Sequence, residues 1–443
     1  MILKSTFREP LEFNERFTFT IDLLENTSHN VLITGKAGTG KSTLLKYFRE
    51  HTLKNVAVLA PTGVAAVNIQ GQTIHSFFCM RPDTTPDSVY NIRLRKTQKA
   101  IYKNLDAVVI DEVSMVRADL LDCVDNFLRA HGKHPDLPFG GVQMIFFGDL
   151  LQLPPIVTRV EASTFGSSYE SAYFFDSKIF IELVKNDKIM FVELDKIYRQ
   201  KDEVFINLLG NIRSGQLTAE NMNMINSRVV RDFVPPENEF FIYLTTTNRL
   251  ADEVNEKELA KLAHPHCKFK AEISGKFEAN SYPTKESLEL KVGAQVMMLN
   301  NDTEGRWVNG TVGRVVDLNP RQDKISVELE DGKLVDVEPF EWDMYRFYFD
   351  EDLNRLESES IGAFKQFPIR LAWAVTIHKS QGKTFSKVIV DVGWGAFATG
   401  QIYVALSRCT DFEGVILKRP IGKKDILIDD RVIAFMKTIN NKE

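Results

Sequence analysis

The chain has 443 residues and a net charge of −5, and 44% of its residues are hydrophobic. This length favours two to four domains of an ordinary soluble protein, and the charge neither favours nor excludes a nucleic-acid partner, because a local basic track is sufficient. No run of about 18 apolar residues occurs, which argues against a membrane span, and the four cysteines lie far apart without a CxxC pair, which argues against zinc and disulfides and favours a reducing compartment.

Four short apolar runs predict an α/β domain in the first part of the chain. They cover residues 31–34, 56–60, 107–110 and 144–147, and each is followed by a turn and a polar or helical stretch. Apolar runs without alternation are buried on both faces, as in a parallel sheet covered by helices. Residues 79–105 interrupt the pattern and predict an insertion, although a solvated helix face is the alternative for its basic residues Arg93, Arg95, Lys96, Lys99 and Lys103.

The second part of the chain predicts another α/β lobe with its own insert. Residues 159–172 have the composition of a flexible loop, and apolar runs return at 190–194, 241–244, 373–377 and 388–390. Residues 325–330 alternate between apolar and polar, and Asp331-Gly332 then turns the chain into 334–337, which is a hairpin pattern. Together with 292–299 and 308–318, this hairpin predicts a small β-barrel.

A phosphate-binding loop is predicted at residues 35–42, where GKAGTGKS matches GxxxxGK[ST] between a predicted strand and a predicted helix at 43–49. The glycines let backbone N–H groups approach phosphates, and the helix N-terminus adds positive potential. We expect Lys41 to reach the β- and γ-phosphates and Ser42 to hold Mg²⁺. A plain glycine-rich turn is disfavoured because strand, loop and helix follow in order. The predicted nucleotide-binding residues are Gly35, Ala37, Gly38, Thr39, Gly40, Lys41, Ser42 and Thr43.

Further catalytic candidates follow the apolar runs. Asp111 and Glu112 end the run at 107–110, where Asp111 would join Ser42 as a metal ligand and Glu112 would polarise water; without the phosphate loop, such a pair is more often a turn. Gln152 could sense the γ-phosphate through its neutral amide. Arg199 and Arg408 could supply transition-state charge across a cleft, although a lone arginine is more often in a surface ion pair.

Eight segments, taken in order, resemble the superfamily 1 helicases, and most closely the PIF-type (petite integration frequency) DNA helicases of superfamily 1B. They are GKAGTGKST (35–43), APTGVAAVNIQGQTIHSFF (60–78), DEVSM (111–115), FGGVQMIFFGDLLQLPP (139–155), LDKIYRQ (194–200), LTTTNRLADEVN (244–255), VTIHKSQGKTF (375–385) and QIYVALSRC (401–409). The resemblance covers nearly the whole chain. It implies ATP bound between two RecA-like P-loop lobes, with Gly382 added to the nucleotide-binding set and with the catalytic residues Lys41, Asp111, Glu112, Gln152, Arg199 and Arg408.

The resemblance also implies domain boundaries. RecA-like domain 1A would cover 1–78 and 105–190, and the inserted wedge domain 1B would cover 79–104. RecA-like domain 2A would cover 191–254 and 366–443, and the inserted SH3-like β-barrel domain 2B would cover 255–365. The expected fold class is therefore α/β, with parallel sheets in both lobes and an insert in each.

A DNA path across both lobes is implied by the same segments. Taken alone, Phe77 is more often a core residue, and His75 and His378 are more often satisfied core histidines. The resemblance implies that Phe77 contacts DNA, where its ring offers a stacking face; base stacking is worth about 1–3 kcal/mol per base. Trp373 is expected in the core. The DNA-contact residues implied by the resemblance are Pro61, Thr62, Gly63, His75, Ser76, Phe77, Thr246, Thr247, Asn248, His378, Lys379 and Ser380.

The implied function is that of an ATP- and Mg²⁺-dependent 5′→3′ DNA helicase acting on single-stranded DNA and on tailed or forked duplexes. G-quadruplexes and RNA–DNA hybrids are further candidate substrates, and DNA repair, recombination and telomere maintenance are the family's roles. We expect a monomer, because one chain supplies both lobes, with an oligomer on DNA as the open alternative. We also expect a nucleoid-associated protein of the bacterial cytoplasm without membrane contact.

Two alternatives and one departure from the family stay open. A P-loop ATPase that remodels protein or RNA would lack DNA-stimulated turnover, and a nucleotide-gated DNA-binding module would have a degenerate site, which intact Lys41, Asp111 and Glu112 disfavour. These helicases usually carry a glutamine upstream of the phosphate loop that reads adenine. Here residues 12–20 contain none, and Arg16 or Thr18 occupies that position, so adenine selectivity is not predicted.

Overall fold

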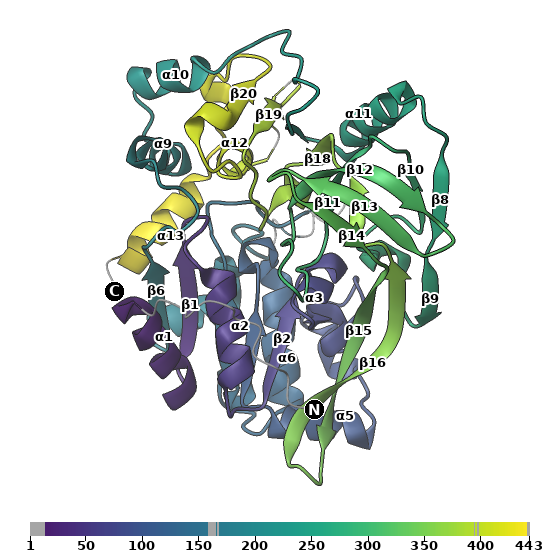
Figure 1. Ribbon diagram of the computed structural model, residues 1–443. Coiled ribbons are helices and arrows are strands. Elements are labelled where there is room, and N and C mark those ends of the chain that lie inside the picture. The colour runs from purple at the N-terminus through teal and green to yellow at the C-terminus, as the bar shows by residue number, and fades with distance from the viewer. Residues whose placement is uncertain (1–13, 158–164, 166–167, 394, 397, 441–443) are drawn as a thin grey trace.

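The computed structural model describes residues 14–157, 165, 168–393, 395–396 and 398–440 (Figure 1). Its first lobe is built on a six-stranded sheet in which every neighbouring pair of strands is parallel. In spatial order the strands are β3 (Gln72–Thr73), β2 (Val56–Ala60), β4 (Ala107–Ile110), β5 (Gln143–Phe147), β1 (Asn30–Gly35) and β6 (Ile189–Leu194). The apolar runs predicted as strands in this part of the chain are confirmed.

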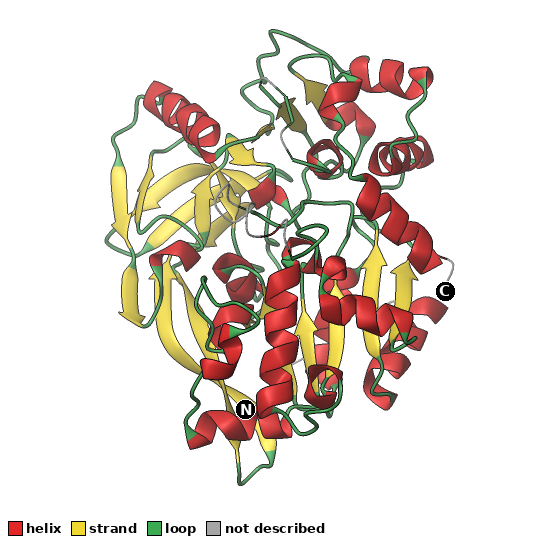
Figure 2. Ribbon diagram, turned by 180° about the vertical axis from the view of Figure 1, so that it is seen from behind, coloured by secondary structure: helices red, strands yellow, loops and turns green. Residues whose placement is uncertain are grey.

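Helices cover both faces of this sheet (Figure 2). Along β4, Val108 and Ile110 belong to one buried cluster, whereas Ala107 and Val109 belong to another, so alternate side chains fill cores on opposite faces. This two-sided burial is why the strand carries no polar alternation. The helices of this part of the chain are α1 (Glu15–Asn26), α2 (Lys41–His51), α3 (Gly63–Asn68), α4 (Ile74–Phe77), α5 (Lys96–Asn104), α6 (Ala118–His131) and α8 (Lys178–Lys185).

The second lobe contains a four-stranded parallel sheet in the order β18 (Ala374–Thr376), β7 (Ile242–Thr245), β19 (Val388–Asp391) and β20 (Val415–Leu417). Its core includes one face of α9 (Glu203–Ser214) and nearly all of α12 (Gln401–Leu406). The remaining helices are α10 (Ala219–Asn226), α11 (Asn248–Lys261) and α13 (Asp430–Asn440).

Two expectations about the second lobe are wrong. The run at 190–194 was assigned to it, but β6 pairs along its whole length with β1 of the first sheet. The C-terminal helix α13 was also assigned to it, but Val432, Met436 and Ile439 lie in the first lobe's core, and the Phe435 ring stacks on Phe175 at 4.4 Å. An apolar run predicts burial in a sheet but does not identify its neighbours, which explains the first error; the second arose because the domain limits implied by the resemblance do not show where a terminal helix packs.

The insert in the second lobe is rich in antiparallel strands. One sheet has the order β14 (Leu334–Val337), β13 (Lys324–Leu329), β12 (Val312–Asn319), β11 (Gln295–Met298) and β17 (Ile369–Leu371), which confirms the predicted hairpin. A pair formed by β8 (Cys267–Lys270) and β10 (Ser287–Leu290) shares its core. The expected insert limits of 255 and 365 shift, because Asn255 on α11 exchanges hydrogen bonds with the backbone of Ala374 on β18, while β17 pairs with β11.

A long hairpin of the insert, which no sequence pattern predicted, reaches the first lobe. It consists of β15 (Phe340–Asp350) and β16 (Arg355–Gln366), flanked by β9 (Glu272–Gly275), and in Figure 1 it runs beside β2 and α5. The N–H of Phe347 donates to Gln72 Oε1 at 3.1 Å, and the N–H of Leu356 donates to Asn55 Oδ1 at 2.7 Å. The insert therefore contacts both lobes.

The segment expected as a wedge, 79–104, folds into a 3₁₀ turn at Ser88–Asn91 and the helix α5. Ile101 and Tyr102 on α5 are buried in the first lobe's core, so this helix is a packed element with one solvated face. The loop expected at 159–172 lies largely outside the described residues. Among the helices that the structure describes, none has the length and apolar character needed to cross a membrane.

Candidate nucleotide and nucleic-acid site

The phosphate loop joins β1 to α2 as predicted, and its lysine is held inside the loop. Lys41 Nζ donates to the backbone oxygens of Gly35 at 2.8 Å and Lys36 at 3.0 Å. Burial lowers the pKa of Lys41, while Asp149 and Glu112 oppose that shift. The ammonium group therefore lies within electrostatic reach of carboxylates that follow two neighbouring strands, β4 and β5.

The segment that follows β6, including Tyr198 and Arg199, packs directly onto this loop. Gly38 has φ +82°, and an ideal Cβ there would lie 2.6 Å from Cβ of Arg199, so only glycine fits. The N–H of Tyr198 donates to the Gly38 oxygen at 2.9 Å. The backbone that carries Arg199, the first proposed finger, therefore contacts the phosphate loop.

The two acids after β4 lie next to each other and are largely buried. The N–H of Glu112 donates to Asp111 Oδ1 at 3.0 Å, and Glu112 has φ +51°, a left-handed conformation that is uncommon for a non-glycine residue. Burial and the neighbouring charge of Glu112 raise the pKa of Asp111 to about 7. Within the described ranges no group of three His, Cys, Asp or Glu side chains could hold a metal ion.

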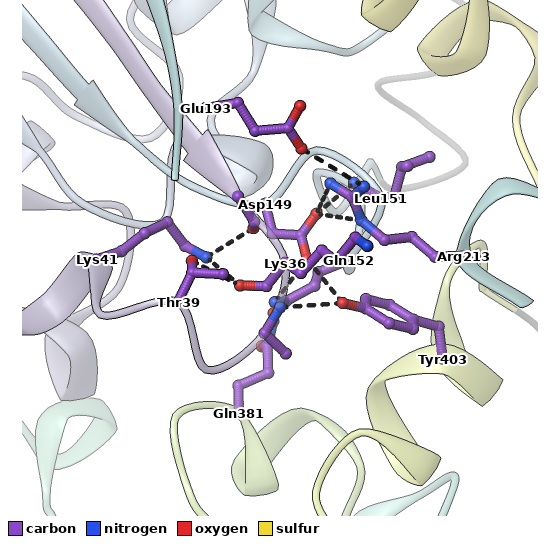
Figure 3. Close-up of polar contacts among 12 residues, drawn as sticks. Lys36, Thr39, Lys41, Asp149, Leu151, Gln152, Glu193, Arg213, Gln381 and Tyr403 are labelled. Carbon is purple, nitrogen blue, oxygen red and sulfur yellow. Dashed lines mark hydrogen bonds and ion pairs between the residues drawn. The ribbon is translucent and has the colours of Figure 1, made fainter. Parts of the chain in front are cut away.

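Gln152 lies in a polar cluster between the lobes (Figure 3). Its Nε2 donates to Asp149 Oδ2 at 3.1 Å, and its Oε1 accepts from Gln381 Nε2 of the second lobe at 3.3 Å. The amide is thus already bonded on both sides. Because the amide NH2 group carries two N–H donors, a contact with a phosphate would not require Gln152 to give up its bond to Asp149.

Both proposed arginine fingers lie close to groups of the first lobe, and both bond within the second lobe. Arg199 Nη1 donates to the Ser407 oxygen at 3.2 Å. Arg408, with 1% of its surface exposed, donates from Nε to the Val404 oxygen and from Nη2 to Ser407 Oγ, each at 3.0 Å. Burial and the charge of Arg199 lower the pKa of Arg408, whereas Tyr403 and Glu112 oppose that shift. Gly382 is exposed, has φ +73°, and lies in the chain between Ser380 and Lys383, whose backbone oxygens both accept from Arg408.

The upstream segment that would read the base is well anchored. Arg16 Nε donates to the Glu193 oxygen at 3.1 Å, and Thr18 Oγ1 donates to the Asn14 oxygen at 3.2 Å. Arg16 also lines an open pocket with Asn14, Glu15, Phe19, Asp195 and Lys196.

Of the DNA-contact residues expected in the first lobe, most are at least partly accessible and one, Phe77, is buried. Pro61, Thr62 and Gly63 follow β2, and Thr62 caps α3; Ser76 is exposed and His75 is half-buried. Phe77 is only 4% exposed, its ring packs against Phe78, Tyr102 and Phe347, and its carbonyl accepts the Tyr102 hydroxyl at 2.5 Å. The assignment of Phe77 to base stacking is therefore wrong for this conformation.

The DNA-contact residues expected in the second lobe also include both exposed and buried side chains. Thr247, Asn248 and Lys379 are exposed near the ends of β7 and β18, and His378 is half-buried. Thr246 is 8% exposed. Ser380 is fully buried, its hydroxyl donates to the Ile377 oxygen at 2.7 Å and its carbonyl accepts from Arg408. Ser380 is therefore not available for DNA in this conformation.

Comparison with known proteins identifies the family. The sequence model described as "PIF1-like helicase" matches residues 16–223, and the one described as "DNA helicase Pif1, 2B domain" matches residues 273–318. The chain is 31% identical to the ATP-dependent DNA helicase Pif1 of Bdellovibrio bacteriovorus over 96% of this chain and 92% of that protein. The chain belongs to the Pif1 family of DNA helicases. It is an ATP-hydrolysing DNA helicase, as the motifs predicted.

Solved Pif1 structures share the fold of this chain, but their TM-scores to it differ. Bacteroides sp. Pif1 in complex with ADP-AlF4 is 34% identical, with a TM-score of 0.88 over 98% of each chain. Bacteroides Pif1 bound to single-stranded DNA is equally identical and equally covered, but its TM-score is 0.67. The parts of this chain are thus arranged more like the first Pif1 structure than the second.

Sequence reasoning missed three residues of the site, namely Asp149, Arg213 and Tyr403. Asp149 lies in the GDLLQLPP segment that resembles the Pif1 family, but it was given no role. One signal was present for Arg213, because it continues the i, i+4 series of Phe205 and Leu209 on the buried face of α9. A charge on an apolar helix face predicts a buried partner.

Proposed function

We propose that this Pif1-family helicase moves 5′→3′ along single-stranded DNA, driven by hydrolysis of ATP in the crevice between its lobes, and separates tailed or forked duplexes ahead of it. The observation that carries the proposal is the convergence of Lys41 and Glu112 from the first lobe with Arg199 and Arg408 on one crevice. A site completed by both lobes ties hydrolysis to their relative movement. The resemblance to 5′→3′ helicases supports the polarity.

For hydrolysis, we assign charge stabilisation and water activation to different residues. Lys41 would exchange its two backbone partners for the β- and γ-phosphate oxygens, and Glu112 would orient and polarise the attacking water. Arg199 and Arg408 would stabilise the charge that develops in the transition state, and Gln152 would report the presence of the γ-phosphate. Gly35, Ala37, Gly38, Thr39, Gly40, Ser42, Thr43 and Gly382 would surround the nucleotide.

Mg²⁺ fits this site through Ser42 and Asp111. The raised pKa of Asp111 reflects two buried carboxylates side by side, a negative charge that a divalent cation would neutralise. Ser42 and Asp111 would hold the ion, which would supply positive charge against the negative charge of the phosphates.

For DNA, we propose a track formed by the exposed and half-buried residues of the predicted set. The strand would cross Pro61, Thr62, Gly63, His75 and Ser76 in the first lobe and Thr247, Asn248, His378 and Lys379 in the second. Hydroxyl, amide and backbone groups at strand ends suit phosphate contacts, which position a nucleic acid without reading its sequence. These contacts do not require deoxyribose, so RNA and RNA–DNA hybrids are further candidate substrates, as are G-quadruplexes.

The site is complete within one chain, which supports action as a monomer. The bacterial origin of the Bdellovibrio relative supports a place in the bacterial cytoplasm. Residues 79–104 are the proposed wedge, because their basic helix α5 packs beside the hairpin β15–β16 at the surface of the first lobe.

One experiment tests these claims together. ATP turnover would be measured with and without single-stranded DNA, followed by unwinding of matched duplexes with a 5′ tail, a 3′ tail or a fork. Faster unwinding from the 5′ tail is expected, and Glu112→Gln should abolish it. Faster unwinding from the 3′ tail would refute the polarity. Turnover without DNA stimulation would favour an ATPase that remodels protein, and stimulation by RNA alone would favour RNA as the track.

A further inference from the structure

Asp149 connects the two lobes through its carboxylate. It follows β5, its residue surface is 1% exposed, and within its own loop it accepts from the Leu151 N–H at 3.2 Å and Gln152 Nε2 at 3.1 Å. From the second lobe it accepts from Arg213 Nη2 at 3.1 Å and Nε at 3.3 Å, and from the Tyr403 hydroxyl at 3.3 Å. Figure 3 shows these side chains converging from separate elements. We call Asp149, Arg213 and Tyr403 the Asp149 network.

Tyr403 links this network to the phosphate loop. The N–H of Ala37 donates to the Tyr403 hydroxyl oxygen at 3.0 Å, while the hydroxyl donates its proton to Asp149. Burial and the charge of Asp149 raise the pKa of Tyr403, so the hydroxyl stays protonated and keeps both roles. A loop N–H of the kind that binds phosphate is therefore held by a side chain of the opposite lobe.

The helix that carries Tyr403 also touches the Asp149 loop through its backbone. Gly400 precedes α12 with φ +71°, and an ideal Cβ there would lie 2.4 Å from the Leu151 oxygen and 2.7 Å from the Gln152 oxygen. Two residues after α12 ends, the chain reaches Arg408. A shift of α12 would therefore change the Asp149 network and the position of a proposed finger together.

The charge balance of the network depends on the distance between the lobes. Burial alone would raise the pKa of Asp149, but Arg213 and Lys41 together lower it, so the group is an ionised carboxylate. If the second lobe moves away, Arg213 leaves and the negative charge of Asp149 remains near Lys41. An unpaired buried carboxylate would compete with the phosphates for Lys41.

We propose that Asp149, Arg213 and Tyr403 are positioning residues that transmit the position of the second lobe to the phosphate loop. With the lobes together, Arg213 neutralises Asp149 and leaves Lys41 to the substrate. With the lobes apart, Asp149 opposes ATP binding, and Ala37 loses its partner on α12. This inference rests on the proposed function in one respect, namely that single-stranded DNA changes the position of the lobes.

The first test uses Tyr403→Phe, which removes the hydroxyl and keeps the ring. The readout is the stimulation factor, the ratio of kcat for ATP at saturating oligothymidine to kcat without it. A fall of about tenfold is expected, the equivalent of one hydrogen bond to a charged group. Tyr243→Phe is the matched control, because Tyr243 is a half-buried tyrosine of the second lobe outside both sites. Equal stimulation factors in Tyr403→Phe and the wild type would overturn the link.

The second test measures KM for ATP in Arg213→Gln, Asp149→Asn and the double variant. Arg213→Gln should raise KM about tenfold, because it leaves the carboxylate unpaired, and adding Asp149→Asn should restore most of the affinity. Asp425→Asn is the matched control, since Asp425 has a 1% exposed side chain paired with Arg419 at 2.8 Å and accepts from Arg419 and Gly422 rather than from the Asp149 network. A KM within twofold of the wild type in Arg213→Gln would refute the charge argument. If DNA fails to stimulate the wild type, the proposed function fails, and this KM comparison still decides the network.

Discussion

An ideal Cβ on Gly63 of the first lobe would lie 1.9 Å from the hydroxyl oxygen of Ser281 in the insert. Gly63 is one of the proposed DNA contacts, so the insert here covers part of the proposed track. The arrangement of the chain is less similar to the Bacteroides Pif1 structure bound to single-stranded DNA than to the ADP-AlF4 complex. For DNA to bind at Gly63, the insert must first leave it, because Ser281 covers that position.

The first prediction follows from that contact. A Gly63→Cys/Ser281→Cys variant should form a disulfide on oxidation, because the ideal Cβ of Gly63 lies 2.8 Å from Cβ of Ser281 and a small shift reaches disulfide geometry. Oxidation should weaken binding of single-stranded DNA at least about tenfold, and a reductant should restore it. The two single-cysteine variants control for the exposed Cys79. Undiminished binding by the oxidised protein would mean that DNA does not need the covered surface.

The second prediction concerns the proposed fingers. Arg408→Ala and Arg199→Ala should each lower DNA-stimulated turnover by about two decades or more, while affinity for ATP stays near that of the wild type. Arg408 is buried among backbone carbonyls, so thermal unfolding must be compared in parallel, with Arg408→Lys as the variant that keeps the charge. Wild-type turnover in Arg408→Ala would remove Arg408 from the catalytic set.

The third prediction distinguishes core packing from DNA stacking at Phe77. Phe77→Leu should lower the free energy of unfolding by roughly 1–2 kcal/mol, because the ring fills the space between Tyr102 and Phe347. Affinity for single-stranded DNA should stay within about twofold. Phe78→Leu, at a fully buried neighbour, should behave alike. Lost DNA affinity with unchanged stability would restore the stacking assignment.

The fourth prediction is a pH dependence of stability. Burial and the nearby charge of Arg370 lower the pKa of Lys383 to about 8 in the folded protein, against an ordinary value of 10.5. Between these values the unfolded chain holds a proton that the folded chain has released, so the contribution of Lys383 to the free energy of unfolding rises with pH, by up to about 1.4 kcal/mol per pH unit. Chemical denaturation from pH 7 to 10 should show this slope in the wild type and lose it in Lys383→Met. Parallel curves for the two proteins would contradict the lowered pKa.

The sequence was sufficient to predict most of the strands and the phosphate loop, because a two-sided buried strand and a loop such as GKAGTGKS have local signatures. It failed where the outcome depends on which surfaces meet. The partner of β6 and the docking of α13 on Phe175 are examples. The hairpin β15–β16 was missed because most of its length is exposed or half-buried, and the packing of its tip on the first lobe is not visible in its own pattern.

In the candidate site, too, local sequence located some residues, whereas others depend on how distant parts of the chain pack. Lys41, Asp111 and Glu112 follow predicted strands and could be located from those strands, whereas Phe77 and Ser380 were assigned to DNA although their surroundings bury them. Asp149, Arg213 and Tyr403 lie more than 60 residues apart in the chain and meet only after both lobes have formed. Each alone is an ordinary polar residue.

The insert also affects the order in which the chain folds. The strand β7 ends at Thr245 and its neighbour β18 begins at Ala374, so the insert separates two adjacent strands of the second sheet. On the ribosome, the first lobe's strands up to Leu194 emerge together, whereas β7 must wait for its partners until the insert has been synthesised. An insert that has already folded shortens the loop to be closed, and this lowers its entropic cost. Until β18 and β19 are synthesised, both edges of β7 would be unpaired, and this strand would be the part of the nascent protein most prone to aggregation.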